Sequence, residues 1–286
     1  MREDKTLTLI LLIVLLLAAL HLSTYLMPVG EAKQDFSDIP QAFVEAIELL
    51  NETNHILDKT SRGIFPEEDR IVDIYDRGLR VSKKIREFEE SLEEGDLAEK
   101  LKMTSLSYRS AAEGAALSVN ASTTVASAFI KVREALTLAT RCKINESLEI
   151  WKESKPLVLK AIAELEDVFE VLTIGSSEYM LSNQHAEIYD KGVAVTADLL
   201  ASLKEAYKVM ELVAEYSDEF ERLCEGEEPN MDLKRAILSL SPERAGRLGY
   251  LVASIKSKVL NCGLCQGGGG YGVGGGAGYT SPSSDD

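Results

Sequence analysis

The chain has 286 residues, 45% of them hydrophobic and 27% charged, which is the ordinary composition of a folded protein. Its formal net charge is −16, and its basic residues form no stripe or cluster. A protein that binds nucleic acid needs clustered Lys and Arg to meet the phosphates. The composition therefore argues against nucleic acid as a partner.

The first 32 residues form a leader that predicts membrane insertion. Leu7 to Met27 is an apolar stretch of 21 residues, and as a helix it would span about 31 Å, the thickness of the hydrocarbon layer of a bilayer. Arg2 and Lys5 precede it and basic residues are sparse just after it, which favours a body outside the cytoplasm. We expect segment 1–32 to be an uncleaved signal anchor; the alternative is cleavage after this segment, followed by secretion.

Three Asn-x-Ser/Thr sequons agree with a location outside the cytoplasm. They begin at Asn51, Asn120 and Asn145, and such tripeptides are acceptors for N-glycosylation in secreted proteins. Tripeptides of this kind also arise by chance. They therefore support the location only in combination with the leader.

The residues after 35 show a helical pattern almost throughout. Apolar residues recur at spacings of 3 and 4, most clearly along 71–92, and the alternation typical of strands is nearly absent. Pro156 is expected to open a helix, and Gly114, Asn120 and Gly192 are expected to interrupt longer ones. The predicted helices cover residues 38–60, 67–94, 96–141, 155–173, 178–224 and 231–261. The pattern predicts an all-α fold, an elongated antiparallel helical bundle with a coiled-coil seam.

One short stretch of the sequence occurs twice. Residues 73–81 read DIYDRGLRV, and residues 187–195 read EIYDKGVAV. Apolar residues upstream of the two copies also align, so we expect two duplicated three-helix units, at 36–152 and at 153–262. Two such units packed together would bury apolar faces that a single unit leaves exposed.

The repeated motif has two interpretations, helix packing and ligand binding. Its residues are Tyr75, Asp76 and Gly78 in the first copy, and Tyr189, Asp190 and Gly192 in the second. A glycine on a helix seam lets another helix approach closely, which offsets the cost of about 1 kcal/mol that glycine imposes on a helix. Packing is the simpler interpretation. The alternative is a pair of pseudo-symmetric polar sites that bind a small ligand.

The C-terminal segment 263–286 differs in composition from the rest of the chain. It is dominated by glycine from residue 267 onward. Ordering so many glycines costs more conformational entropy than their few neighbouring side chains can offset. We expect this segment to be a disordered tail.

The four cysteines are Cys142, Cys224, Cys262 and Cys265. Outside the cytoplasm we expect them to be oxidised. In an up-and-down layout, the third and fifth predicted helices end at the same pole of the bundle. This favours a Cys142–Cys224 bridge and leaves the other two cysteines to each other, although sequence alone leaves three pairings open.

Metal and redox chemistry have weak support in the sequence. Cys262 and Cys265 follow a helix, whose negative end disfavours a reactive thiolate, and a four-thiolate zinc site would usually contain two close cysteine pairs. Glu52 and His55 have the i, i+3 spacing of a di-iron ligand pair, but the second Glu-x-x-His that such a site needs is missing because Ser182 precedes His185 at that spacing. The sequence therefore predicts no catalytic residue, no cofactor and no metal ligand.

These features together predict a non-enzymatic scaffold or adaptor, anchored in a membrane with its helical body outside the cytoplasm. Its partners would be the membrane, through the leader, and proteins, including a second copy of the chain. The first alternative is a sensor-like extracytoplasmic domain that binds a small ligand between helices. The second is a secreted metal or redox protein.

Overall fold

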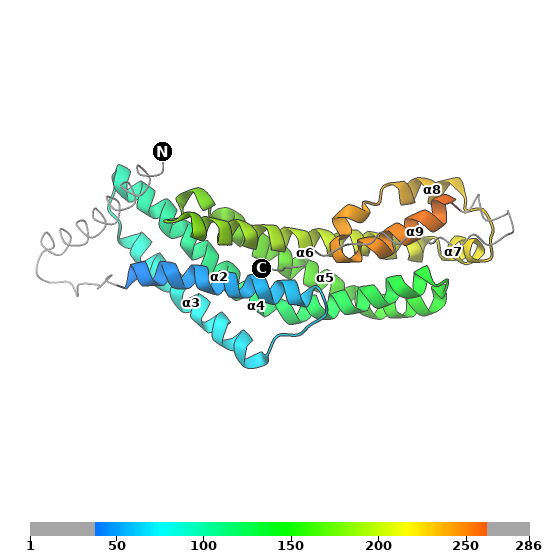
Figure 1. Cartoon of the computed structure of the whole chain (residues 1–286), viewed down its shortest axis with the longest axis horizontal. Coiled ribbons are helices and arrows are strands. Elements are labelled where there is room, and N and C mark those ends of the chain that lie inside the picture. The colour runs from blue at the N-terminus through cyan, green and yellow to red at the C-terminus, as the bar shows by residue number, and fades with distance from the viewer. Residues whose placement is uncertain (1–37, 262–286) are drawn as a thin grey trace, which may run out of the picture.

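The computed structural model describes residues 38–261, and these form an elongated bundle of α-helices (Figure 1). Three long helices run the length of the rod in alternating directions: α4 (Asp96–Thr140), α5 (Ile144–Ile174) and α6 (Asn183–Glu215). Within 38–261, no helix is both long and apolar enough to cross a membrane. The predicted span in 1–32 and the predicted tail at 263–286 lie outside the described residues.

Two further helices cover one half of the rod. They are α2 (Ile39–Thr60) and α3 (Glu68–Ser91), and both pack against the N-terminal half of α4. The core of this half includes Phe43, Ile74 and Ile85, with exposed fractions of 1%, 0% and 0%. The end of α5 and the start of α6 complete it. We call this part of the molecule the α2–α3 half.

Four short elements cover the other half of the rod. They are α7 (Ser217–Cys224), α8 (Met231–Leu238), the 3₁₀ segment η2 (Pro242–Leu248) and α9 (Gly249–Asn261). Their apolar side chains pack on the C-terminal half of α4, the start of α5 and the end of α6. We call this part the short-helix half.

Helix α4 lies at the centre of the bundle because its side chains are small. It contacts α2, α3, α5, α6 and α9, and its buried positions are mostly Ala, Ser and Gly. Small side chains let several neighbours approach one helix at once, and the larger apolar residues of those neighbours fill the space. Gly114 illustrates this, because a Cβ atom there would collide with the Leu172 side chain of α5.

Local sequence signals set several helix ends. Pro40 lies in the first turn of α2, where its missing N–H is not needed. The side chains of Ser182 and Asn230 accept hydrogen bonds from the backbone N–H groups of His185 and Leu233, and so cap α6 and α8. Gly63 follows α2 with a φ of 80°, a conformation that glycine adopts without strain.

The prediction that Pro156 opens a helix is wrong, because α5 begins at Ile144 and continues through Pro156. Proline removes the N–H that would bond the Lys152 carbonyl, but both residues are exposed, so water can take that acceptor. The segment before Pro156 is instead fixed by its packing. Trp151 is buried there, and the Ser147 hydroxyl donates to the Ala135 carbonyl of α4 at 2.8 Å.

The predicted interruptions at Gly114, Asn120 and Gly192 are also wrong, since α4 and α6 run through them without a break. The predicted helix 178–224 is instead divided at Tyr216. The predicted helix 231–261 is divided into α8, η2 and α9, with Gly246 at a φ of 49°. An added Cβ at Gly246 would lie 2.5 Å from Ser202 Oγ, so the chain bends there to fit against α6.

The two halves of the rod do not coincide with the two sequence units predicted at 36–152 and 153–262. Helix α5 crosses that boundary without interruption, and each core cluster contains residues from both units. The duplication itself stays a prediction, since the shared motif is a property of the sequence that no structural relative tests.

Candidate functional site

The glycines of the repeated motif lie in two different helix contacts. A Cβ at Gly78 would lie 2.8 Å from the backbone oxygen of Ala112, so α3 approaches the backbone of α4 there. A Cβ at Gly192 would lie 3.1 Å from a methyl group of Leu50, so the second contact is between α6 and α2. Close helix approach is thus the local role of both glycines.

The tyrosines and aspartates of the motif do not converge on a common pocket. Tyr75 is half-buried, whereas Tyr189 is 2% exposed and donates a hydrogen bond to the Leu172 carbonyl. Burial raises the pKa of Tyr189 to about 12. Asp76 and Asp190 are both exposed, and none of the six motif residues lines the three hollows described below.

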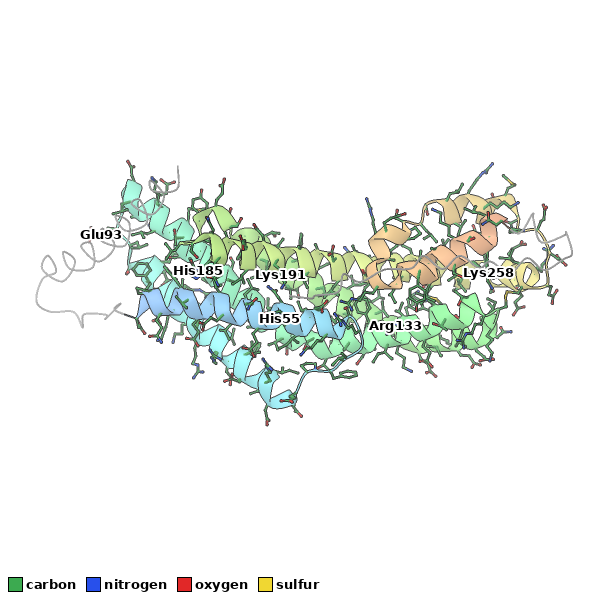
Figure 2. All side chains as sticks on the ribbon, in the orientation of Figure 1. His55, Glu93, Arg133, His185, Lys191 and Lys258 are labelled. Atoms are coloured by element: carbon green, nitrogen blue, oxygen red, sulfur yellow. A yellow bond between two sulfur atoms is a disulfide. The ribbon has the colours of Figure 1, made fainter. Side chains whose placement is uncertain are left out.

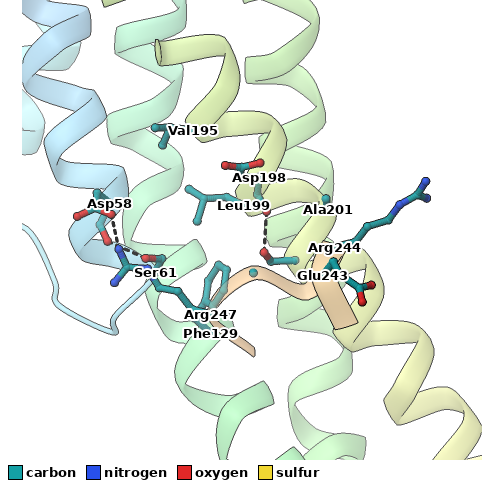
Figure 3. A pocket seen from close by; sticks show the side chains of 12 residues that line it. Asp58, Ser61, Phe129, Val195, Asp198, Leu199, Ala201, Glu243, Arg244 and Arg247 are labelled. Atoms are coloured by element: carbon teal, nitrogen blue, oxygen red, sulfur yellow. Dashed lines mark hydrogen bonds and ion pairs between the residues drawn. The ribbon is translucent and has the colours of Figure 1, made fainter. Parts of the chain in front are cut away.

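A cavity of about 420 Å³ opens between α2, α6 and η2 (Figure 3). Its wall contains the carboxylates of Asp58, Asp198 and Glu243 and the guanidinium groups of Arg244 and Arg247. Figure 3 shows Arg247 reaching from η2 to Asp58 on α2, whereas Arg244 extends away from them. The charges in the wall are therefore largely balanced, and the Asp58–Arg247 ion pair joins two elements far apart in the sequence.

The hydroxyl groups in this cavity are not set up as nucleophiles. Ser61 donates to the backbone oxygen of Asp58 at 2.7 Å, and Ser202 donates to that of Asp198 at 2.7 Å. An activated serine would instead donate to a general base. The cavity could hold a small polar molecule, but its residues do not assemble a hydrolytic site.

A buried tyrosine–histidine contact lies in the α2–α3 half, and sequence analysis missed it. The Tyr108 hydroxyl accepts a hydrogen bond from the Leu181 backbone N–H at 2.9 Å. The same hydroxyl forms a hydrogen bond with His185 Nδ1, 2.6 Å away. Phe43 stacks on the Tyr108 ring with centroids 4.5 Å apart. The contact attaches the connection between α5 and α6 to α4.

Burial favours the uncharged form of both partners, and it therefore shifts their pKa values in opposite directions. The pKa of Tyr108 rises to about 12, because burial disfavours the phenolate. The pKa of His185 falls below its usual value because burial disfavours the imidazolium, an effect that the Glu48 carboxylate partly opposes. Because Tyr108 and His185 are separated by 77 residues, no local sequence signal could have paired them.

The bridge between Cys142 and Cys224 is present in the structure, as the sequence predicted, with a Cα–Cα distance of 5.6 Å. It ties the second residue after α4 to the last residue of α7. Lys258 of α9 lies beside it, with Nζ 3.3 Å from Cys142 Sγ, at the opposite end of the rod from Glu93 (Figure 2). Cys262 and Cys265 lie outside the described residues.

A hollow of about 550 Å³ adjoins the bridge. Both cysteines line it, together with Lys258 and Asn261, the last described residue of the chain. Sequence analysis predicted the pairing but not the lysine. The combination of a disulfide, a cation and an open hollow makes this pole the chemically most distinctive place among the described residues.

The three sequons lie at different depths. Asn51 is half-buried in α2, Asn120 is exposed in α4, and Asn145 is exposed and donates to Glu221 at 2.8 Å. The hydroxyl residue two positions after each asparagine is buried with an exposed fraction of 0%. Their glycosylation stays a prediction.

Glu52 and His55 do not form a metal site with other residues. Glu52 is paired with Arg70 of α3 at 2.6 Å, and His55 is exposed on α2 (Figure 2). Throughout 38–261, no group of three or more His, Cys, Asp or Glu side chains could hold a metal ion.

No protein-family model matches the chain, and comparison with curated proteins and with solved structures finds no match. The functional argument therefore rests on the residues and their geometry.

Proposed function

We propose that the protein is a non-enzymatic scaffold or adaptor, anchored in a membrane by its N-terminal segment, whose helical body presents protein-interaction surfaces outside the cytoplasm. The observation that carries this proposal is the contrast between a well-buried apolar core and a segment, residues 64–79, in which several large apolar side chains are exposed. A ligand-binding domain would instead enclose an apolar pocket. Apolar residues gathered on a surface are typical of protein contacts.

The exposed apolar residues of this segment are Ile64 and Phe65, in the connection before α3, and Val72 and Leu79 on α3 itself; we call these four residues the α3 corner. Their exposed fractions are 50%, 50%, 55% and 44%, and they are four of the twelve large apolar residues exposed within 38–261. The N-terminal end of α3 stands away from the rod in Figure 1. Ile64 and Phe65 also line a shallow hollow of about 140 Å³.

Helix α3 arranges part of the corner as a stripe. Val72, the half-buried Tyr75 and Leu79 follow one another at spacings of 3 and 4, which places them on one face of the helix. The opposite side of the same helix is already used, because Ile74, Gly78 and Val81 pack into the bundle. Val72, Tyr75 and Leu79 therefore form a short apolar strip outside the bundle contact, among exposed charged residues, and this strip is suited to a helix or loop of a partner.

The disulfide supports a location outside the cytoplasm. Disulfides persist in oxidising compartments and are rare in the cytosol. The Cys142–Cys224 bridge joins residues 82 apart, as a structural crosslink in a secreted or surface-exposed domain would. The finer architecture belongs to the same proposal: an N-terminal transmembrane helix, two duplicated three-helix units and a disordered glycine-rich tail.

The test of this proposal compares two surface variants of the full chain. In the first, Val72→Asp and Leu79→Asp place charge on the α3 corner; in the second, Leu159→Asp does so on α5, where the native side chain is similarly exposed at 45%. Both variants should unfold at the wild-type urea concentration. Partners cross-linked in intact membranes, or a second copy of the chain, should be lost only from the first variant.

The proposal would be contradicted if the protein fractionated with the cytosol and all its thiols were reduced. It would also be contradicted if the α3-corner variant kept the same cross-linked partners in the same yield.

The cavity between Asp58 and Arg247 favours the sensor-like alternative more than any other feature does. A small polar ligand could replace the Asp58–Arg247 ion pair with contacts of its own. If this alternative holds, a panel of small anions and zwitterions should contain a compound that raises the melting temperature of the wild type, with Arg247→Gln abolishing that rise. A scaffold should respond to none of them.

A further inference from the structure

Four exposed residues of α3 share one face of the helix. Successive residues are about 100° apart around a helix axis, and by this measure the four fall within about 60° of arc. They are Glu68, Val72, Leu79 and Lys83, and we call them the α3 strip. The opposite side of the helix packs into the bundle. The strip therefore presents an apolar centre, Val72 and Leu79, with one charged residue at each end.

The charge of α3 is polarised along its length. Residues 67–69 are all acidic, whereas residues 80–86 contain four basic residues and no acidic one. The helix macrodipole favours acidic residues in a first turn and basic residues in a last turn. It does not explain the basic cluster, because the last turn of α3 contains no basic residue. The cluster therefore suits a carboxylate that lies outside the helix itself.

Lys83 is available for such a contact. Its side chain is 78% exposed, and its ion pair with Glu87 on the same helix is long, at 3.7 Å. Exposed ion pairs contribute little to stability, so exchanging this one for a contact with a partner costs little. A partner that fits the strip needs a cation opposite Glu68, an anion opposite Lys83 and apolar groups between them.

The order of residues along the strip meets these needs by itself. The midpoint of Val72 and Leu79 falls between residues 75 and 76, and the midpoint of Glu68 and Lys83 falls at the same place. If a second α3 lies antiparallel about a two-fold axis at that point, Val72 faces the partner's Leu79. Glu68 then faces the partner's Lys83, and each contact forms twice. A parallel arrangement would instead place like charges opposite each other.

We propose that the α3 strip binds the α3 strip of a second copy of the chain, antiparallel, about a two-fold axis between residues 75 and 76. The inference rests on the scaffold proposal, because it names the partner of the α3 corner. The N-terminal end of α3 stands away from the rod (Figure 1), which leaves the strip accessible to a second helix. The strip is about 22 Å long from Glu68 to Lys83. A contact this small gives weak, reversible pairing, which anchoring both copies in one membrane would favour.

Asp76 provides a test of where the axis lies. It is exposed at the edge of the strip and lies next to the proposed axis. Because a two-fold axis relates identical residues, the two Asp76 carboxylates lie on the same side of the pair and repel each other. Neutralising Asp76 should therefore strengthen the pairing of two copies, whereas it would weaken the binding of a basic partner.

The main experiment reverses the charges of the strip in the full chain. Glu68→Lys places two cations opposite each other in both contacts, Lys83→Glu does the same with two carboxylates, and each should weaken self-association about tenfold. The double variant E68K/K83E restores opposite charges within its own pairs and should return to within about twofold of the wild type. Energy transfer between fluorescently labelled full-length chains in lipid vesicles measures the association.

Mixtures of variants give a second measurement of the same contacts. Chains with Glu68→Lys should pair with chains with Lys83→Glu about as well as the wild type pairs with itself, because both contacts between them join opposite charges. The double variant should pair poorly with the wild type, since both contacts are then repulsive. Asp76→Asn should strengthen self-association about twofold.

A matched control comes from α5. Lys160→Glu reverses an exposed lysine that has the same kind of ion pair along its helix, with Glu164 at 3.6 Å. It should leave self-association unchanged. All variants should unfold at the wild-type urea concentration, so that any loss of pairing is assigned to the surface.

The proposal would be overturned by a wild type that shows no self-association, by a double variant as weak as the single ones, or by an Asp76→Asn variant that fails to strengthen pairing. If the charge reversals instead removed a different cross-linked protein, that protein would be the partner of the strip. The scaffold proposal would then stand, and only this inference would fail. If they changed neither self-association nor any cross-linked partner, both would fail.

Discussion

The two halves of the rod are stabilised in different ways. In the α2–α3 half, the added helices contain 22 and 24 residues, and they pack along α4 over most of their length. In the short-helix half, the added helices α7, α8 and α9 contain 8, 8 and 13 residues. Helices this short are marginal on their own in water.

The short-helix half compensates with specific long-range bonds. The disulfide fixes α7, the buried Glu205 carboxylate accepts a hydrogen bond from the Ser241 backbone N–H at 2.5 Å, and Lys256 donates to the Leu240 carbonyl at 2.7 Å. The α2–α3 half also has polar bonds between its elements, such as Glu52 with Arg70 and Tyr108 with Leu181. Its long added helices bury an apolar side against α4 as well, whereas the short helices of the other half gain a covalent crosslink. The difference lies in the disulfide and in helix length, because a short helix has less side-chain packing to hold it in place.

The largest expected effect comes from removing the disulfide. Replacing Cys142 and Cys224 by Ser should lower the free energy of unfolding by about 4 kcal/mol, because an 82-residue separation is no longer closed in the unfolded chain. Urea unfolding measures this loss, and hydrogen exchange should locate it in α7 to α9. If protection from hydrogen exchange fell equally in α2 and α3, the disulfide would stabilise both halves of the rod to the same extent, and this comparison would fail.

The second prediction concerns Glu205, which is 3% exposed. Glu205→Leu should cost about 2 kcal/mol, because it leaves the Ser241 N–H without its acceptor. Glu205→Gln keeps an acceptor oxygen and should cost much less. Equal losses in the two variants would show that the carboxylate charge, and not the hydrogen bond, holds η2.

The third prediction compares the two glycines of the repeated motif. Gly78 lies in the contact between α3 and α4, and Gly192 lies in the contact between α6 and α2. Gly78→Ala should lose about 1 kcal/mol, because the new Cβ meets the backbone of α4, and this overpacking outweighs the gain in helix propensity. Gly192→Ala meets movable side chains of α2 and should be neutral or slightly stabilising. Thermal unfolding of the two variants measures the difference, and the reverse order would refute the assignment of α3–α4 as the tighter seam.

The fourth prediction tests how much the hydrogen bonds of Tyr108 contribute to the stability of the α2–α3 half. Tyr108→Phe removes the acceptor for the Leu181 N–H and the hydrogen-bond partner of His185 Nδ1. The expected loss is about 1 kcal/mol, smaller than that of Glu205→Leu. If Tyr108→Phe lowered the free energy of unfolding more than Glu205→Leu does, the α2–α3 half would depend on this polar contact more than the short-helix half depends on Glu205.

The smallest expected effect is a pH dependence at His185. Burial lowers its pKa in the folded state, so the unfolded chain binds the proton more readily, and stability falls as the pH drops through the ordinary histidine range toward the lowered pKa. His185→Gln should therefore lose less stability than the wild type between pH 7.5 and pH 5. His55→Gln, at an exposed site, serves as the control and should follow the wild-type curve.

The helical periodicity predicted the ends of α2 and α4 to within one residue and those of α3 to within three, because an apolar spacing of 3 and 4 is a local property of one helix. It did not predict where α6 ends or how 231–261 is divided. Those breaks depend on how the chain fits against distant partners, such as Gly246 against Ser202 of α6. Pro156 shows the same limit, because packing of Trp151 outweighs a local signal to start a helix.

For the candidate site, too, the sequence predicted some features and long-range packing decided the others. The sequence located the four cysteines and, through the up-and-down layout, favoured the Cys142–Cys224 pairing. It did not indicate that Lys258 would lie beside them, since 116 residues separate that lysine from Cys142. The Tyr108–His185 contact escaped prediction for the same reason.

The sequence by itself determined that this body is helical, because helix formation depends on neighbours three and four residues away. Only the tertiary structure decided which helices meet, where the rod divides into two halves and which charges lie beside the bridge. Those outcomes follow from packing between residues that are distant along the chain. The local apolar periodicity does not indicate which of those residues come into contact.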